Sequence, residues 1–423
     1  MNSINGALQR FGVTYGEENR SGITEMSSII SFQKDRASAN EVSMTGLQQL
    51  YKGSNNLHCI SHTITHVGEH MPANDAKRFM EDLCALCNSH GGNNKAASHW
   101  RVVFKTCWQP PGNTRWWAKL ELYKKMFLKF NDLISFCMTA EADGDMERSA
   151  RMKRLSDTVS CDEQRAILRL QLAVLTLVGG HLVSATYNLE GDKCCSLVTY
   201  DTIKDCESWL NDNYDHLTYP GMAAEIEDCV KTLIGGNESY EGMGVDELKA
   251  DLRDKIKIIL DGAVKYFNNT LIVKLSPDVE IYRTSKFANP IAMRHVMLSP
   301  NTLVDFKESV KNLQRFTRNQ IEDMAGEWHQ YKRLVNEFEM LPSDITVEGQ
   351  LECCPIFWAH YQKVIPNLAI FARYCMTLTP SSAAAERVFS HLKNSFTVGQ
   401  MRQSLEDYTE GSMMLQYNKF RAV

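Results

Sequence analysis

Two carboxylates occupy positions from which a protein could bind a divalent metal, Asp35 near the start of the chain and Glu386 near its end. Asp35 follows a short apolar run, 29–32, that predicts a strand. Parallel sheets present functional groups at the carboxyl ends of their strands. The alternative role for Asp35 is that of a helix N-cap, which is common. Glu386 flanks the apolar stripe of a helix that the alanines 383–385 favour.

Cysteine and histidine recur at spacings that could bind zinc. Cys59 and His62 form a Cys-x-x-His pair, which could be half of a zinc site. Cys84, Cys87 and His90 could supply the rest. The alternative, which we favour, is that the two cysteines lie one turn apart on an amphipathic helix as inert, half-buried thiols. Neither pair has the repeated spacing that makes a zinc signal strong.

A basic and aromatic segment begins at Arg115 and runs to position 129. It contains five basic residues and one acidic residue, a net charge of +4. Aromatic rings among cations can stack on an unpaired base while the cations contact phosphate. The alternative is an amphipathic helix with buried aromatic residues and solvated lysines. The candidate DNA-binding residues are Arg115, Trp116, Lys119, Lys124 and Lys125.

The elements that must position these residues change along the chain. Apolar runs at 29–32 and 57–60 are separated by a helical stretch over 41–50, and this strand–helix–strand order is typical of an α/β core. The polar, glycine-containing segment 17–28 is predicted to be a loop. After about residue 112, long apolar stripes with helical spacing, such as 248–267, predict a large all-helical block.

Composition limits the class of protein. A chain of 423 residues is long enough for two or three domains, and its net charge of −5 excludes a globally basic nucleic-acid-binding protein. The 13 cysteines are scattered and no secretory signal opens the chain, which indicates reduced thiols in the nucleus or cytoplasm. The apolar stretch 168–183 is interrupted by polar residues, so we expect a buried helix and no membrane partner.

Several of these segments together resemble one protein family. The segment 378–390, Leu-Thr-Pro-Ser-Ser-Ala-Ala-Ala-Glu-Arg-Val-Phe-Ser, is similar to the C-terminal dimerisation signature of hAT-superfamily DNA transposases. The Asp-x-Ala-x-x-Asn segment at Asp35, the Cys-x-x-His pair Cys59 and His62, and the Arg-Trp pair 115–116 resemble further motifs of that family, in the family's order. The resemblance covers about residues 5–420.

The resemblance implies a fold of the α/β plus all-α class, predominantly helical overall. An incomplete RNase H-like core would be interrupted by a large helical insertion. The expected domains are a partial RNase H-like core at 1–111, a helical insertion at 112–341, and a C-terminal dimerisation region at 342–423 that completes the core.

The resemblance also implies roles for particular residues. In the family, three carboxylates hold two divalent ions, about 4 Å apart, against a phosphodiester. Asp35 and Glu386 match two of them and are the expected catalytic and metal-binding residues. Trp116, beside Arg115, matches the tryptophan that stacks on DNA at the cleavage point. The residues expected in dimerisation are Trp358, Leu378, Pro380, Ser382, Arg387 and Phe389.

The third carboxylate of the family's site is expected on a first strand upstream of Asp35. Three strands, a helix and their connections need roughly 40 residues, and 34 residues precede Asp35. We therefore expect an N-terminally truncated, catalytically incomplete chain. Its sheet would be stunted, with two or three strands under a helical body.

The expected function is non-enzymatic: a nuclear, hAT transposase-derived protein that forms at least a homodimer, associates with DNA and needs no cofactor. The alternative is an active metal-dependent transposase or nuclease that cleaves DNA strands with Mg²⁺ or Mn²⁺ at a DDE-type site, using a compensating third ligand. A helical scaffold unrelated to DNA would require every motif match to be chance.

Overall fold

The structure, a computed structural model, describes residues 17–19, 22–25, 30–34, 45–51, 53–88, 95–111, 116–141, 150–191, 193–216, 221–236, 244–296, 300–338 and 346–383. We call these the described residues. The chain divides into two compact units. Unit 1 contains residues 1–62, 186–202 and 274–423, and unit 2 contains residues 63–185 and 203–273.

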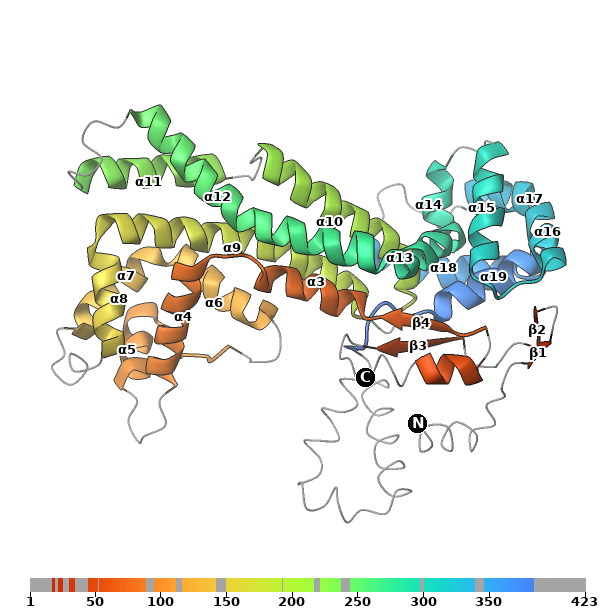
Figure 1. The fold of residues 1–423 in the computed structure, drawn as a ribbon, viewed down its shortest axis with the longest axis horizontal. Helices are drawn as coiled ribbons and strands as arrows, with labels where there is room; N and C mark the ends of the chain where they lie inside the picture. The colour runs from red at the N-terminus through yellow and green to blue at the C-terminus, as the bar shows by residue number, and fades with distance from the viewer. Residues whose placement is uncertain are drawn as a thin grey trace, which may run out of the picture. The chain divides into compact units, whose positions relative to one another are not determined.

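The strands belong to unit 1. The strands are β1 (Glu17–Asn19), β2 (Gly22–Glu25), β3 (Ser31–Lys34) and β4 (Asn55–His58). β1 pairs antiparallel with β2, and β3 pairs in parallel with β4, with Lys34 opposite His58. Figure 1 shows β3 and β4 as adjacent arrows. Residues 45–50 between them are helical, so the predicted strand–helix–strand order is confirmed.

Two local expectations for this region were wrong. The segment expected to be a loop, 17–28, contains the hairpin of β1 and β2, because backbone pairing joins two short polar segments that have no apolar alternation. The second strand ends at His58, and Ile60 opens a helix instead of extending the strand.

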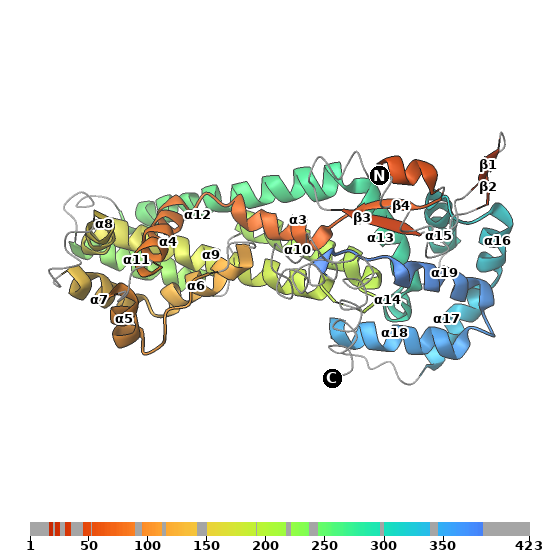
Figure 2. The same ribbon diagram turned by 90° about the horizontal axis from the view of Figure 1, so that it is seen from below.

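Several helices of unit 1 begin where the sequence carries start signals. The helices between residues 274 and 383 are α13 (Ser276–Ser285), η3 (Lys286–Ala288), α14 (Pro290–His295), α15 (Pro300–Asn312), α16 (Arg318–Gly326), α17 (Trp328–Glu337), α18 (Val347–Tyr361) and α19 (Pro366–Thr377). Asn289 caps α14, Thr317 forms a capping box with Gln320 at α16, and Thr346 caps α18. Figure 2 shows α18 and α19 side by side.

An aromatic cluster forms the core of these helices. Trp328 packs at 4.5 Å from Phe306, ring centre to ring centre, and Tyr331 at 5.0 Å from Trp358. The short helix η3 accepts from two polar atoms of the cluster, the Tyr331 hydroxyl and the Trp358 indole, whereas the buried Trp328 Nε1–H has no partner among the described residues. The Trp358 Nε1–H donates to the Ala288 carbonyl at 2.7 Å, so that the indole is both packed and hydrogen-bonded.

A proline inside α18 is compensated by a neighbouring thiol. Pro355 has no N–H, so the Leu351 carbonyl, four residues earlier, loses its helical donor. The buried Cys194 thiol donates to that carbonyl at 3.5 Å. Burial raises the pKa of Cys194 to about 11, so the thiol retains the proton that this contact needs. The cysteine therefore has a structural role here.

The described residues of unit 2 form helices and their connections, without a strand. The unit is built from α4 (Asn74–Cys87), α5 (Lys95–Phe104), α6 (Trp116–Leu128), α7 (Phe130–Glu141), α8 (Ala150–Ser160), α11 (Met222–Gly236) and α12 (Val245–Phe267). It also holds most of α3 (Ile60–Glu69), α9 (Asp162–Leu189), α10 (Ser196–His216) and the π-helix η2 (Asn268–Lys274). Helices α4, α5, α7 and α8 pack against one another in Figure 1.

The apolar stripes expected from the sequence form the core of unit 2. In α12, Leu248, Leu252 and Ile256 are buried, as the spacing predicts. Helix α9 covers the apolar stretch 168–183 and is long and apolar enough to cross a membrane by length and composition, although 61% of its most apolar window is buried in the fold. The prediction of a buried helix is confirmed.

Two residues of unit 2 fix how its helices meet. The buried Gln171 of α9 accepts from the Ala76 N–H at the start of α4 and donates to Asp75. Gly262 of α12 lies against the backbone that follows α3. A Cβ at Gly262 would come within 2.1 Å of the His70 carbonyl oxygen, so only glycine allows this approach.

The described residues thus confirm a predominantly helical fold with few strands. The RNase H-like identity of the core stays a prediction, as do the domain boundaries at 111/112 and 341/342. Unit 1 contains residues 274–338 together with the strands and the C-terminal helices.

Candidate functional site

The carboxyl end of the β3–β4 pair is joined to the beginning of the C-terminal signature. The Ile60 N–H donates to the Pro380 carbonyl at 2.8 Å, and the Thr379 hydroxyl donates to Gln33 Oε1 at 2.7 Å. The signature therefore meets β3 and the first residue of α3, which follows β4, although more than 300 residues separate them in sequence. The predicted dimerisation residue Pro380 contributes its backbone carbonyl to this junction.

The family-motif residue Cys59 is part of the same junction. Its sulfur, 2% exposed, accepts from the Ser382 N–H at 3.2 Å and lies 3.3 Å from the Ser382 hydroxyl. The Ser61 hydroxyl donates to Ser381 at 2.8 Å. His62 is half-buried in the first turn of α3. The geometry gives Cys59 a structural role in holding the C-terminal segment.

A buried carboxylate that the sequence did not single out lies at this strand end. Asp278 of α13 accepts from the His58 N–H at 2.7 Å, and its Oδ2 lies 2.9 Å from the His58 Nδ1. Its side chain is 8% exposed. Tyr282, one turn further along α13, donates to the Thr379 carbonyl at 2.9 Å. Helix α13 thereby fastens both β4 and the signature.

The expected catalytic pair, Asp35 and Glu386, lies outside the described residues, as do Arg115, Arg387 and Phe389. Their roles stay predictions. Among the described residues, no group of three or more histidine, cysteine, aspartate or glutamate side chains could hold a metal ion. In α4, burial raises the pKa of Cys84 to about 11 and that of Cys87 further.

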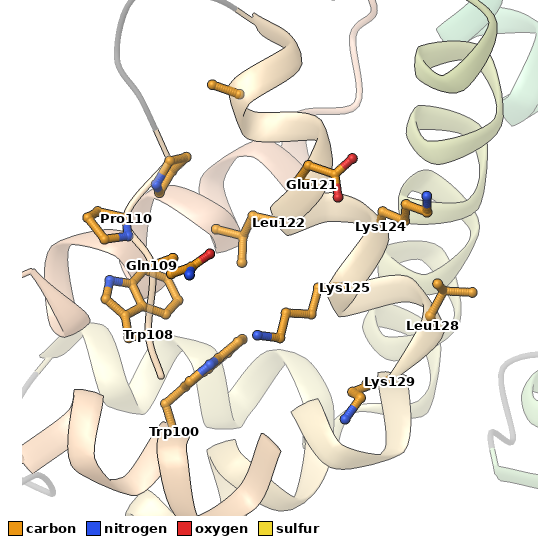
Figure 3. A pocket seen from close by; sticks show the side chains of 12 residues that line it. Trp100, Trp108, Gln109, Pro110, Glu121, Leu122, Lys124, Lys125, Leu128 and Lys129 are labelled. Carbon is orange, nitrogen blue, oxygen red and sulfur yellow. The ribbon is translucent and has the colours of Figure 1, made fainter. Parts of the chain in front are cut away.

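The basic and aromatic segment forms one wall of a cleft in unit 2. Figure 3 shows this cleft, of about 410 Å³, between α6 and the loop that follows α5. Trp100 and Trp108 line it together with Lys124, Lys125 and Lys129. The charged lining residues are these three lysines and Glu121, a net charge of +2. We call it the α5–α6 cleft.

Two of the predicted DNA-binding lysines therefore lie together, and one does not. Lys124 and Lys125 line the α5–α6 cleft. Lys119 is instead near Lys77 of α4, and its charge helps burial to lower the pKa of Lys77. Trp116 is the first residue of α6, and its side chain lies outside the described part of the chain.

The sequence interpretation missed the aromatic residues that the cleft uses. Trp100 and Phe104 stack in α5 with ring centres 3.6 Å apart, and Trp108 meets Trp100 edge-on at 5.0 Å. Trp100 and Phe104 are four residues apart, a spacing that places both side chains on one face of α5. Trp108 lies in the loop after the helix, and no local pattern indicated that it meets Trp100.

The remaining predicted dimerisation residues lie in well-packed positions. Trp358 and Leu378 are 2% and 1% exposed, so they pack inside the folded chain, and their role in dimerisation stays a prediction. Three apolar side chains of the same region are exposed instead: Ile356 on α18, Val364 after it and Ile370 on α19, at 45–46%.

One comparison bears on this region. Residues 337–417 match the family model of the hAT family C-terminal dimerisation region. This segment contains α18, α19 and all six expected dimerisation residues. No curated protein matches the chain significantly. The resemblance is confirmed over residues 337–417, which are similar to that family's C-terminal dimerisation region.

Proposed function

We propose that this hAT transposase-like chain acts as a self-associating, DNA-associated nuclear protein that does not cleave DNA. The observation that carries the proposal is the match of residues 337–417 to a dimerisation region. The exposed apolar residues Ile356, Val364 and Ile370 of that region add support. A second copy of the chain would remove such side chains from water, which favours association.

DNA association is supported by the chemistry of the α5–α6 cleft. Lysines attract phosphate, and tryptophan offers a flat surface on which bases stack. Because the chain as a whole is acidic, with a net charge of −5, DNA contact must come from such a local basic surface. Nuclear localisation follows from a function on genomic DNA.

A cleavage assay separates the non-enzymatic proposal from its alternative. Asp35 and Glu386 match two of the family's three metal-binding carboxylates. The alternative, a metal-dependent nuclease, predicts that the protein with Mn²⁺ cleaves nicked DNA and that Asp35→Asn abolishes cleavage. Cleavage that depends on Asp35 would replace the non-enzymatic proposal with this alternative.

Self-association is tested by size-exclusion chromatography with light scattering. We expect the mass of a dimer, or of a larger assembly of dimers, at micromolar concentration in 0.15 M salt. A strict monomer across the micromolar range would contradict the proposal. DNA association is tested separately with a duplex of random sequence, whose binding should weaken as salt rises.

A further inference from the structure

The α5–α6 cleft has the composition of a binding site for a flat, anionic ligand. Its floor and one side are aromatic, from Trp100 and Trp108, and its other side carries lysines of α6 (Figure 3). Its volume of about 410 Å³ lies within the range of small-ligand sites. The cleft is made entirely from residues of unit 2.

The indole of Trp108 is held in a fixed orientation. Its Nε1–H donates to Asn88 Oδ1 at 2.6 Å, and it meets Trp100 edge-on with an interplanar angle of 85°. The loop that carries it leaves α5 through Lys105, whose φ of 56° is uncommon for a residue other than glycine. A half-buried tryptophan fixed in this way loses little conformational entropy when a ligand stacks on it.

The cations of the cleft are close together and only partly compensated. Lys125 donates to the Thr106 hydroxyl at 2.5 Å, and its ammonium points into the cleft, 5.4 Å from the centre of the Trp100 ring (Figure 3). Lys129 donates to the Phe104 carbonyl at 3.2 Å. Burial lowers the pKa of Lys125, and the charge of Lys129 lowers it further. An anion in the cleft would relieve this repulsion.

We propose that the α5–α6 cleft binds an unpaired nucleotide, with its base against Trp108 and its phosphate at Lys125 and Lys129. This inference rests on the DNA association proposed above and names the form of nucleic acid that the cleft accepts. Stacking requires a base face that is not covered by neighbouring bases, which a single strand offers and an intact duplex does not. Trp116, the residue matched by the family motif, begins the same helix, α6, and its side chain lies outside the described residues.

The test measures the binding of a fluorescein-labelled eight-residue oligo(dT) by anisotropy, with a duplex of equal length for comparison. We expect the single strand to bind more tightly than the duplex. Trp108→Leu should weaken binding of the single strand roughly tenfold, and Trp108→Phe should restore most of it, because phenylalanine still stacks. Lys129→Gln should make the binding of the single strand less dependent on salt. The slope of log K for this binding against the logarithm of the salt concentration should become about 0.7 less steep.

Matched controls are available in the same chain. Lys153→Gln removes an exposed lysine of α8, and Tyr187→Leu removes a tyrosine that is 58% exposed on α9. Neither residue lines the cleft, so neither variant should change the binding of oligo(dT). Should Trp108→Leu fail to fold, Lys129→Gln decides the test through its effect on the salt dependence of binding.

Several results would overturn the proposal. The first three are no binding of oligo(dT), equal binding of single strand and duplex, and unchanged binding in Trp108→Leu. The fourth is that an acidic, tryptophan-containing peptide displaces the labelled oligo(dT) whereas unlabelled oligo(dT) does not. A titration with free dTMP measures whether the cleft also binds a free nucleotide, for comparison with a nucleotide within a strand. Light scattering on the same samples measures self-association independently. A chain that does not bind oligo(dT) in the cleft is therefore distinguished from a chain that does not form a dimer.

Discussion

Ser382 donates its backbone N–H to the sulfur of Cys59, a residue 323 positions earlier in the sequence. Its hydroxyl lies 3.3 Å from the same sulfur. Ser382 belongs to the segment that resembles a dimerisation signature, and Cys59 lies between β4 and α3. The beginning of the signature is therefore an internal part of unit 1, joined to its sheet, and a change there should affect folding before it affects association.

The Asp278 carboxylate should be essential for the stability of unit 1. In Asp278→Ala, the His58 backbone N–H loses this acceptor in a partly buried position, and we expect the free energy of unfolding to fall by about 1–3 kcal/mol. Glu280→Ala is the matched control, because the Glu280 side chain is 53% exposed and pairs with Arg283 on the same helix. Its effect should stay within about 1 kcal/mol. Urea denaturation of both variants checks this, and equal losses would argue against a special role for Asp278.

Gly262 should not tolerate a side chain. An alanine inside a helix is ordinarily more favourable than glycine by roughly 0.5–1 kcal/mol. At Gly262, the added Cβ would meet the His70 carbonyl oxygen, so we expect Gly262→Ala to destabilise the protein by about 1–3 kcal/mol. Gly180→Ala in α9 is the control, because nothing lies within 4 Å of its added Cβ.

Thermal unfolding of the two glycine variants, with the wild type beside them, should give shifts of opposite sign. Gly262→Ala should lower Tm and Gly180→Ala should raise it or leave it unchanged. A Gly262→Ala protein as stable as the wild type would show that the backbone around His70 does not pack against α12 in this way.

Alkaline pH should destabilise the fold through its buried thiols. Burial raises the pKa of Cys84 and Cys194 to about 11, and that of Cys206 and Cys229 to about 12, from an ordinary value of 9.0. The folded chain binds these protons more tightly than the unfolded chain does. The free energy of unfolding is therefore highest below pH 9 and falls as the pH rises toward 12.

Urea denaturation between pH 7.5 and 10.5 measures the slope of the free energy of unfolding against pH. Cys206→Ala removes one such thiol and should make the slope less steep, whereas Cys161→Ala removes an exposed thiol and should leave the slope unchanged. The comparison concerns the slope alone, because Cys206→Ala also leaves a small cavity that lowers stability at every pH. A pH-independent stability would contradict the prediction.

The exposed apolar residues of the C-terminal helices should contribute to self-association. We expect the double variant Ile356→Glu, Ile370→Glu to shift the mass from dimer toward monomer, because it places charges on an apolar contact surface. Ile258→Glu on α12 is the control: Ile258 is 63% exposed and lies outside residues 337–417. Light scattering gives the masses, and circular dichroism confirms that the variants are folded.

Much of the secondary structure could be predicted from local pattern. The stripe through α12 recurs at helical spacing and its members are buried, because a repeat of 3.6 residues places them on one face. The strand near Asp35 was correctly located to within two residues. The hairpin of β1 and β2 was missed, because its pairing depends on backbone hydrogen bonds between polar residues that carry no strand pattern.

The candidate site was only partly accessible to sequence reasoning. The basic run in α6 is visible as a local excess of lysine, and Lys124 and Lys125 do line the cleft. The same pattern included Lys119, which lies near α4 instead. Helical spacing says which residues share a face, but it does not say which neighbour that face meets.

The sequence by itself determined the helical character of the chain and its C-terminal resemblance, because both are written in residues close together along the chain. Only the tertiary structure decided that Ser382 meets Cys59, that Asp278 fastens β4, and that Trp108 joins Lys125 in one cleft. These partners are far apart in sequence or on different elements. Their contacts depend on how helices pack, which is the sum of many weak interactions and leaves no local signature.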